Sequence, residues 1–475
     1  MCGYPSDNVS PIRIASEGFS MNENKMAKKP IRILLWTMGL PMVFSMVLQA
    51  LYNVVDTVFV INMGDSGISA NLALTYVFPV QIFMIAVGVG TGIGINAMLS
   101  RVLGEKDQKK IGSTLGNGIF LALVIYLIFL LFGLFGSRWF MSLQTKDSEI
   151  IELGASYLTI VTTCSFGAIG FNVFERFLQA TGKTTHSTIA QVLGALTNIV
   201  LDYVFIYPCG MGVAGAAWAT IIGQVVSLAI AMLFHYFLNK EARHSWKDIL
   251  PNIHIIGGIY KVGWSAMLMQ ALLSISMFVM IAIFGLNENG ALINGAYGIY
   301  YKIQQIALFS CFGMSNTIIS LLSFNLGLSD PKRIRECILW GIIDTMVVAS
   351  IITIVFEALA GPIATLFGFA ATGENKTQII DLTKTSIRYA STGYLFMAFS
   401  LAVQGILQAY RKAWSPLLIS LLRLIVFAVP FALLFVHTGN AIHLVWWAFP
   451  IAEFLTASIS LLILLLLLKP KRVSM

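Results

Sequence analysis

Long apolar segments separated by short polar ones run from near residue 33 to residue 468 of this 475-residue chain. Each has at least the roughly 18–20 residues that a helix needs to cross about 30 Å of hydrocarbon. No polar stretch between them is long enough for a water-soluble domain. The pattern therefore predicts an all-α membrane protein with twelve transmembrane helices. The predicted spans are 33–62, 68–98, 111–136, 152–176, 186–207, 212–239, 257–286, 292–325, 334–360, 384–410, 413–437 and 441–468.

The composition agrees with a membrane protein. Of all residues, 57% are hydrophobic and only 11% are charged, whereas soluble domains carry about 25% charged residues. The five cysteines form no Cys-x-x-Cys pair and have no histidine at ligand spacing, so neither a zinc site nor a disulfide framework is predicted. No basic cluster is interleaved with aromatic residues, and nucleic acid is not expected as a partner.

Lysine and arginine predict the orientation, because cytoplasmic loops retain basic residues and translocated loops tend to lack them. With a cytoplasmic N-terminus, the inner segments hold 22 basic residues and the outer segments with their edges hold five. Both termini are therefore expected in the cytoplasm, in a protein of the cell (inner) membrane whose inner loops face anionic lipid. The inner basic residues include Lys25, Arg101, Lys110, Arg176, Lys183, Lys261, Arg333, Arg411, Lys412 and Lys469.

The chain repeats itself. With an offset of 223, residues 100–118 match residues 323–341 and share the pattern Leu-Gly-x-x-Asp-x-Lys. With an offset of 229, a Leu-Gln-Ala run at 178–180 recurs at 407–409. Six helices per half place both halves in the same orientation, as parallel repeats. The expected domains are a cytoplasmic tail 1–30, an N-lobe 31–239, a cytoplasmic linker 240–256, a C-lobe 257–468 and a cytoplasmic tail 469–475.

Two acids, Asp56 and Asp202, lie inside apolar spans. An Asp at the centre of a membrane helix costs about 2.5–3.5 kcal/mol, so such an acid is a functional candidate. Counted from the outer helix ends, both lie roughly 9 Å deep, Asn198 shares the face of Asp202, and Thr220 lies roughly 12 Å down the next helix. These oxygens suit Na⁺, and neighbouring acids suit reversible binding of H⁺. The alternative is that they only hydrogen-bond helices together.

The second half provides an internal comparison. At the offset of 229, the partners of Asn198 and Asp202 are Phe427 and Phe431, and that of Thr220 is Phe449. Polar groups would be expected in both halves if these positions served the shared scaffold. The pattern therefore predicts a polar site in the first half only.

Several motifs together resemble the multidrug and toxic compound extrusion (MATE) family: the run 48–56, the Asn198-x-x-x-Asp202 pair, Trp218-Ala219-Thr220 and the two repeated motifs. The resemblance covers residues 30–470. It implies a V-shaped pair of six-helix bundles that exports drugs against an inward flow of H⁺ or Na⁺. It also implies an N-lobe cation site, matched here by Asp56, Asn198, Asp202 and Thr220.

The resemblance also bears on a second ion site. Another branch of the family adds acids on helices 7 and 10, where this chain has Gln270, Gln404 and Gln408. A C-lobe ion site is therefore not expected. Candidates for accessory or substrate-cavity positions are Tyr52, Asn53, Gln49, Gln270, Lys302, Arg423 and Glu453.

Three charged residues of the second half, Lys302, Arg423 and Glu453, lie near mid-membrane and require partners. Pairing of Glu453 with one of the bases is favoured over a substrate contact. A base that faced the cavity instead would favour anionic or zwitterionic cargo. Pro41 removes a backbone hydrogen bond inside the first helix and is a candidate hinge.

These observations predict a secondary antiporter for amphipathic, often cationic compounds, coupled to H⁺ or Na⁺. Gly182-Lys183-Thr184 resembles the end of a phosphate-binding loop, but position 177 is Phe, so ATP is not expected as the energy source. An intramembrane enzyme would need a catalytic pair such as His-Glu-x-x-His, which is absent, and the His244-x-x-x-Asp248 spacing lies in the linker. We therefore expect a transporter that is not an enzyme and needs no cofactor. We expect it to be a monomer in the lipid bilayer. The alternative is a flippase for lipid-linked precursors or polysaccharides.

Overall fold

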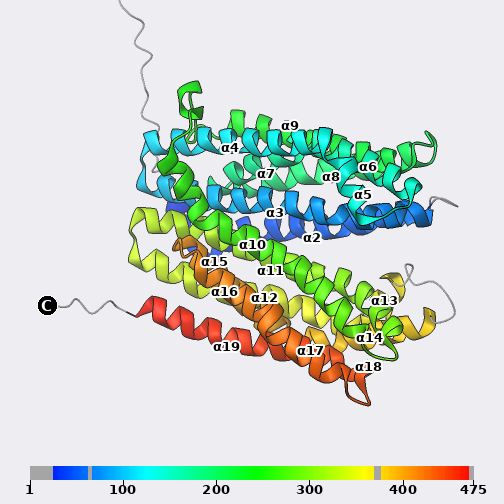
Figure 1. Cartoon of the computed structure of the whole chain (residues 1–475). Coiled ribbons are helices and arrows are strands. Elements are labelled where there is room, and N and C mark those ends of the chain that lie inside the picture. The colour runs from blue at the N-terminus through cyan, green and yellow to red at the C-terminus, as the bar shows by residue number, and fades with distance from the viewer. Residues whose placement is uncertain (1–24, 62–66, 368–375, 470–475) are drawn as a thin grey trace, which may run out of the picture.

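A computed structural model describes residues 25–61, 67–367 and 376–469, and every regular element within these ranges is a helix. Ten helices are long and apolar enough to cross a bilayer, and two bent pairs raise the total to twelve if each pair is one span. Figure 1 shows the helices in two bundles. The prediction of an all-α membrane protein made of two six-helix bundles is confirmed.

The N-lobe comprises α1 to α9, and a short helix in the linker precedes the C-lobe, α10 to α19. The N-lobe helices are α1 Lys25–Lys28, α2 Ile31–Ile61, α3 Gly67–Glu105, α4 Gln108–Phe135, α5 Ser137–Gln144, α6 Ser148–Thr163, α7 Phe166–Ala180, α8 Thr184–Ile206 and α9 Gly212–Leu238. The linker helix is η3, Trp246–Ile249. The C-lobe helices are α10 Ile253–Phe284, α11 Gly290–Leu328, α12 Pro331–Ala358, α13 Ala360–Phe367, α14 Lys376–Ser391, α15 Tyr394–Ala409, α16 Trp414–Leu421, the π-helix η5 Leu422–Phe427, α17 Ala428–Val436, α18 Ala441–Leu444, η6 Val445–Trp447 and α19 Ala448–Leu468.

Two predicted spans are not single helices. The span expected at 152–176 is the pair α6 and α7, bent by 42°, and the span expected at 384–410 is the pair α14 and α15, bent by 54°. Both breaks lie at equivalent points of the repeat. At these breaks, the hydroxyl groups of Thr163 and Thr392 donate to carbonyl groups of the preceding turn, at 2.6 Å to Thr159 O and 2.7 Å to Tyr389 O. Such side-chain bonds compete with the helical ladder, a signal that the apolar pattern does not contain.

The repeated motif Leu-Gly-x-x-Asp-x-Lys forms the turn between two long helices in each lobe. Asp107 accepts a hydrogen bond from the backbone of Lys110 at the start of α4. Asp330 accepts bonds from the backbone of Lys332 and Arg333 at the start of α12. An Asp at this position satisfies N–H groups that a helix start leaves without partners. The repetition therefore has a local structural cause.

Two equivalent helix pairs lie at the interface between the two lobes, beside the crossing of α3 and α11. α3 packs against α10, where a Cβ atom at Gly90 would lie 2.7 Å from the backbone nitrogen of Met267. α11 packs against α2, where a Cβ atom at Gly313 would lie 2.7 Å from the Cα atom of Val43. Gly90 and Gly313 are repeat partners at the offset of 223. Small residues let helix backbones approach closely. Each lobe therefore contributes one such glycine, which faces a helix of the other lobe.

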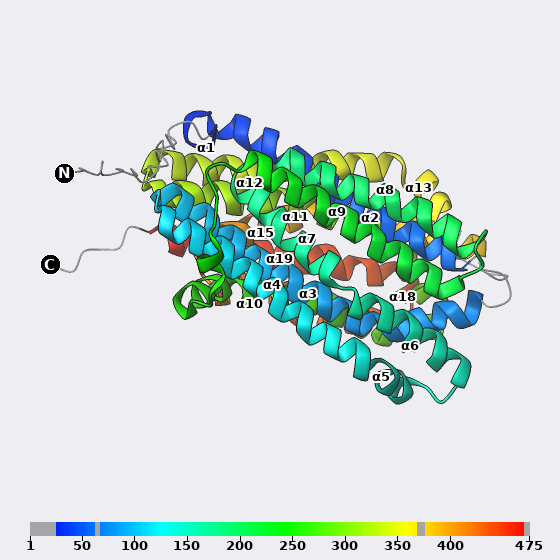
Figure 2. The same cartoon turned by 90° about the horizontal axis from the view of Figure 1, so that it is seen from above.

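One end of the molecule carries both ends of the described chain, next to Lys25 and Lys469, as Figure 2 shows. We call it the basic end, because the helix ends and turns there hold Arg101, Lys110, Arg333 and Arg411. The interlobe contacts at Gly90 and Gly313 lie within about 22 Å of it, fifteen residues from the helix ends. Toward the opposite end the two bundles diverge (Figure 1).

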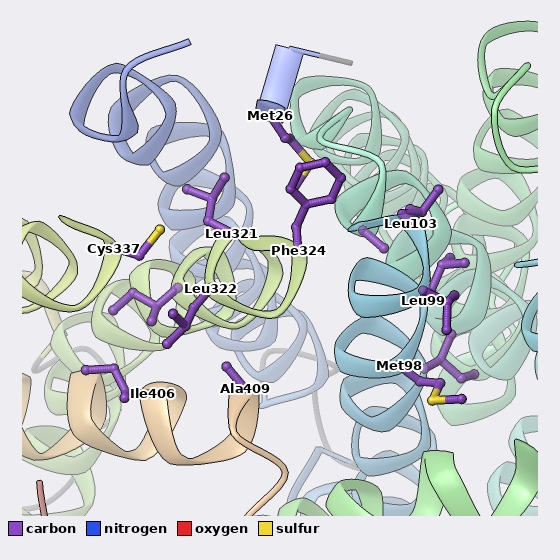
Figure 3. Packing of buried hydrophobic residues seen from close by; sticks show 14 of the residues in the cluster. Met26, Met98, Leu99, Leu103, Leu321, Leu322, Phe324, Cys337, Ile406 and Ala409 are labelled. Carbon is purple, nitrogen blue, oxygen red and sulfur yellow. The ribbon is translucent and has the colours of Figure 1, made fainter. Parts of the chain in front are cut away.

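A hydrophobic cluster joins the lobes at the basic end. Met26 of α1 is fully buried and lies close to Phe324 of α11, with Leu103 of α3 nearby (Figure 3). Arg333 of α12 holds α1 in place, because its Nη2 donates to Met26 O at 2.7 Å and to Lys29 O at 3.1 Å. The N-terminal helix therefore bridges both bundles on this side.

Arg176 is one of the inner basic residues, and it lies inside α7, four residues before the end of that helix. Only 1% of its surface is exposed. Its Nη1 donates to Gln179 Oε1 at 2.7 Å, and Gln179 Nε2 donates to Glu175 Oε1 at 2.8 Å. A buried base needs such partners. Arg176 therefore supports the interior of the N-lobe and does not mark a loop.

Candidate functional site

α2 and α8 are joined by polar contacts along one seam. Thr188 Oγ1 donates to the backbone oxygen of Pro41 at 2.8 Å. One turn further from the basic end, Ser45 Oγ donates to Gln191 Oε1, and both residues are buried. α2 remains helical through Pro41, and its role as a hinge stays a prediction. These contacts fix the register of two helices that run in the same direction.

This register brings the positions of the two acids level. Asp56 lies eleven residues after Ser45 on α2, and Asp202 lies eleven residues after Gln191 on α8. Eleven residues are close to three helical turns and about 16 Å. Both positions therefore lie at the same height on the faces that carry the Ser45–Gln191 contact. They are five and four residues from the ends of α2 and α8, close to the predicted depth.

Three predicted residues of α2 have side chains outside the described part of the structure. They are Tyr52, Asn53 and Asp56, whose helical backbone alone is described. Gln49, one turn before Asn53, is half-buried. The roles of all four stay predictions.

On α8, Asp202 and Asn198 form a buried pair. Asn198 Nδ2 donates to Asp202 Oδ2 at 3.0 Å, and 4% and 1% of the two residues are exposed. Asn198 Oδ1 is buried and has no hydrogen-bond partner among the described residues. A buried carboxylate with an adjacent amide oxygen is a strong electrostatic attractor for a cation. The expected sharing of one helix face by Asn198 and Asp202 is confirmed.

α9 packs closely against this pair. A Cβ atom at Gly223 would lie 2.8 Å from the Cβ atom of Asn198, and one at Gly194 would lie 1.8 Å from Ser227 Oγ. α8 and α9 run in opposite directions, so Thr220, three residues before Gly223, comes level with Asp202, four residues after Asn198. Thr220 is half-buried. Three helices thus contribute positions to one layer near the end opposite the basic end.

The chemistry of this layer suits a small cation. Carboxylate, amide and hydroxyl oxygens are ligands of hard cations, while two nearby acids favour uptake of a proton by one of them. Within the described residues, no three His, Cys, Asp or Glu side chains form a group that could hold a metal ion. A sodium ion there would therefore depend on amide and hydroxyl oxygens in addition to the acids.

Two further candidates lie on the helix faces that turn toward the other lobe. Gln270 lies one turn outward from Met267, on the face of α10 that contacts α3. Lys302 lies on α11, three turns outward from Gly313 on the face that meets α2. Both are half-buried, and Lys302 has no ion pair among the described residues. A contact with substrate stays a prediction for each.

The pairing expected for Glu453 is confirmed. Arg423 Nε lies 3.8 Å from Glu453 Oε1, and both side chains are buried inside the C-lobe. Arg423 belongs to the π-helix η5, whose wider turn packs against α19. At the offset of 229, the pair occupies the positions of Gly194 and Gln224 in the N-lobe. Of the three mid-membrane charges, these two are partners of one another.

This pair leads to a prediction about stability. Replacing Arg423 by Met should destabilise the protein by about 3–5 kcal/mol, because Glu453 would remain as a buried charge without its partner. The double variant Arg423→Met/Glu453→Met should recover most of that loss, since hydrophobic residues often replace a buried pair at little cost. Thermal unfolding in detergent measures both. Equal Tm values for the single variant and the unmodified protein would contradict a structural role for the pair.

At the repeat positions of Asn198, Asp202 and Thr220, the C-lobe carries phenylalanine in place of a polar side chain. Phe427, Phe431 and Phe449 pack against the C-lobe core, and the Phe449 ring stacks on Tyr297 with centroids 6.0 Å apart. The Arg423–Glu453 pair lies closer to the basic end, since Arg423 is eight residues, or about 12 Å, before Phe431. The two bundles therefore differ in where they place charge.

Sequence reasoning missed two buried acids. Asp344 of α12 has 1% of its surface exposed and is close enough to Arg32 of α2 to interact electrostatically. Glu175 lies beside Arg176 in α7. Both are acids within apolar spans, so the rule that singled out Asp56 could have found them. Glu175 has its basic partner next to it in the sequence, whereas Arg32, the base near Asp344, is far away along the chain.

The chain was also compared with known proteins. A family model described as MatE matches residues 41–204 and 265–434, one block in each lobe. The multidrug export protein MepA of Staphylococcus saprophyticus subsp. saprophyticus is 27% identical over 90% of this chain and 92% of that protein. MepA of Staphylococcus aureus is 26% identical over 93% of this chain and 95% of that protein.

Solved structures show the same fold. An outward-facing multidrug resistance MATE family transporter of the MOP superfamily superposes with a TM-score of 0.86 at 23% identity, over 92% of this chain and 96% of that one. A MATE structure in complex with MaL6 gives a TM-score of 0.83 at 24% identity over the same shares. The family match covers most of the sequence and both lobes. This chain is therefore a transporter of the MatE family, as its resemblance to multidrug and toxic compound extrusion proteins implied, and not an enzyme.

Proposed function

We propose that this protein exports amphipathic, often cationic compounds from the cell in exchange for an inward flow of H⁺ or Na⁺. The similarity to multidrug export proteins named MepA supports the class of substrate. The register of α2, α8 and α9 supports the coupling site, because it brings the positions of Asp56, Asp202 and Thr220 to the same height in the bundle. Asn198, bonded to Asp202, completes this layer.

The proposed orientation follows the positive charges, with the basic end in the cytoplasm and the protein in the cell membrane. The lobes touch near the basic end, so the described conformation would be open to the outside, where the coupling ion enters. The positions of the acids lie within about 8 Å of that outer end. An ion can drive the change to the inward-open state only through different affinities for the two states. We propose that occupation of the α2–α8 seam provides that difference.

Transport by inverted membrane vesicles identifies the coupling ion. Loading with a fluorescent cationic substrate is followed while a pH gradient and then a sodium gradient are imposed and separately dissipated. We expect accumulation to collapse with one of the two gradients, and that gradient identifies the ion. Accumulation that persists without either gradient and requires ATP would overturn the proposed mechanism. Vesicles without the protein control for passive partition of the dye.

A further inference from the structure

A pocket of about 430 Å³ opens between α10 and α16 at the basic end. It lies on the C-lobe, away from the layer of Asp202. Three of the residues that line it are basic and two are tryptophans. The lining residues are Lys261, Trp264, Arg411, Lys412, Ala413, Trp414 and Ser415.

The basic side chains of this pocket make no direct ion pair within the described part of the chain, although Glu105 of α3 is close enough to Arg411 to interact electrostatically. Among the described residues, neither Lys261, Arg411 nor Lys412 forms an ion pair with a carboxylate. Arg411 Nη2 donates to the backbone oxygen of Gly258 at 3.0 Å, but its buried Nε has no hydrogen-bond partner. By contrast Lys183, the repeat partner of Lys412, pairs with Glu241 at 2.9 Å. The C-lobe pocket therefore has donors available for an anion.

The start of α16 adds to this charge. Ala413, Trp414 and Ser415 line the pocket, and no side chain caps the first N–H groups of the helix. The N-terminus of a helix carries partial positive charge and binds phosphate or carboxylate groups well. The pocket thus combines three basic side chains with free backbone donors.

Arg411 stands at a turn position where the repeat partner in the other lobe is glycine. Its φ of +58° lies in the left-handed region, which non-glycine residues rarely adopt. The repeat partner in the N-lobe is Gly182, with a φ of +76°. In the N-lobe, this turn lies against Lys25 and Met26 of the chain itself. In the C-lobe, the equivalent turn carries an arginine in an unfavourable conformation and faces the pocket.

The surroundings of the pocket are apolar on the side toward the membrane. The Trp264 and Trp414 rings pack edge to face with centroids 5.0 Å apart, and 70% of Trp414 is exposed. Tryptophan is enriched at the level of lipid headgroups. From there, exposed apolar residues continue at helical spacing along α10 and α16: Leu268, Ile275, Leu418 and Leu421. These faces provide a path for acyl chains.

We propose that this pocket binds an anionic phospholipid, with the phosphate held by Lys261, Arg411, Lys412 and the start of α16, and the acyl chains lying along α10 and α16. A soluble phosphate would use the same charges. The exposed apolar faces and the tryptophan pair favour a lipid, because a free ion gains nothing from them. Basic pockets between transmembrane helices on the cytoplasmic side bind acidic headgroups by the same electrostatics.

The test measures binding of lipid, so it is independent of transport and of the coupling ion. The full-length protein in neutral detergent is titrated with phosphatidylglycerol, and binding is followed by native mass spectrometry and by the rise in Tm. The variant Lys261→Gln/Lys412→Gln should bind roughly 30-fold more weakly, since each basic side chain at an anionic surface contributes about a factor of five. The matched control is Lys109→Gln/Lys332→Gln, which removes two exposed lysines that are repeat partners elsewhere at the basic end.

A second variant, Arg411→Gly, restores the residue of the N-lobe repeat. It should weaken lipid binding with little change of Tm in neutral detergent, because glycine relieves the left-handed backbone and so offsets the loss of the bond to Gly258 O. Phosphatidylcholine and inorganic phosphate complete the comparison. Equal phosphatidylglycerol binding by the pocket variant and the control would overturn the proposal. An equal effect of inorganic phosphate would assign the pocket to a soluble anion instead of a lipid.

Discussion

Replacing Asp202 by Asn is expected to leave a folded protein whose efflux no longer responds to an ion gradient. The substitution conserves shape and keeps an oxygen and an amide next to Asn198, which bonds Asp202 at 3.0 Å. It removes the negative charge that would attract H⁺ or Na⁺ at a position with 1% exposure. Vesicle uptake should fall to the level of passive leak, while binding of substrate to the purified protein persists.

The control for Asp202 is the same chemical change at another buried acid. Asp344→Asn in α12 removes an equally buried carboxylate from the other lobe, and its efflux should keep the ion dependence of the unmodified protein. Asp56→Asn should reproduce the loss seen with Asp202→Asn, and the double variant should add little, because residues that act as one site are not additive. Normal ion-driven efflux by Asp202→Asn would remove the proposed site.

Replacing Gly104 by Ala is expected to hold the basic end open and stop transport. Gly104 and its repeat partner Gly327 meet where α3 crosses α11. A Cβ atom at Gly104 would lie 2.1 Å from the backbone oxygen of Phe324 and 3.0 Å from the Cα atom of Gly327. Backbone atoms cannot move aside as a flexible side chain can. Overpacking of this kind costs about 1–3 kcal/mol, enough to shift a two-state equilibrium by a factor of roughly 5 to 150.

The measurement for Gly104 is the distance between spin labels at positions 109 and 332, which are exposed at the basic end of α4 and α12. The variant should populate a longer distance than the unmodified protein. Gly257→Ala is the matched control, because a Cβ atom there would have no neighbour within 4 Å. If Gly104→Ala kept both the label distance and the rate of efflux, the glycine contact would not be needed for closure. Retained thermal stability separates a shift between states from misfolding.

Much of the fold could be predicted from local pattern. Apolar segment length determined the number of spans, and the repeat at offsets of 223 and 229 determined the two-bundle plan. The acids on α2 and α8 stood out because hydrocarbon penalises charge wherever the chain places it. The Leu-Gly-x-x-Asp-x-Lys repeat also had a local basis, since Asp107 and Asp330 cap the next helix. Each of these features depends only on a few neighbouring residues and on the membrane or water that surrounds them.

Other features depended on which helices meet. The kinks after Thr163 and Ser391, the burial of Arg176 beside Glu175 and the partner of Glu453 could not be read from spacing along the chain. The sequence by itself determined the membrane spans and the acids within them. The reason is that the free energy of transfer into hydrocarbon and the helical rise are contributed by each residue separately. Only the tertiary structure decided that α2, α8 and α9 share one register and that Gly104 meets Gly327, because contacts between distant segments depend on how whole helices pack.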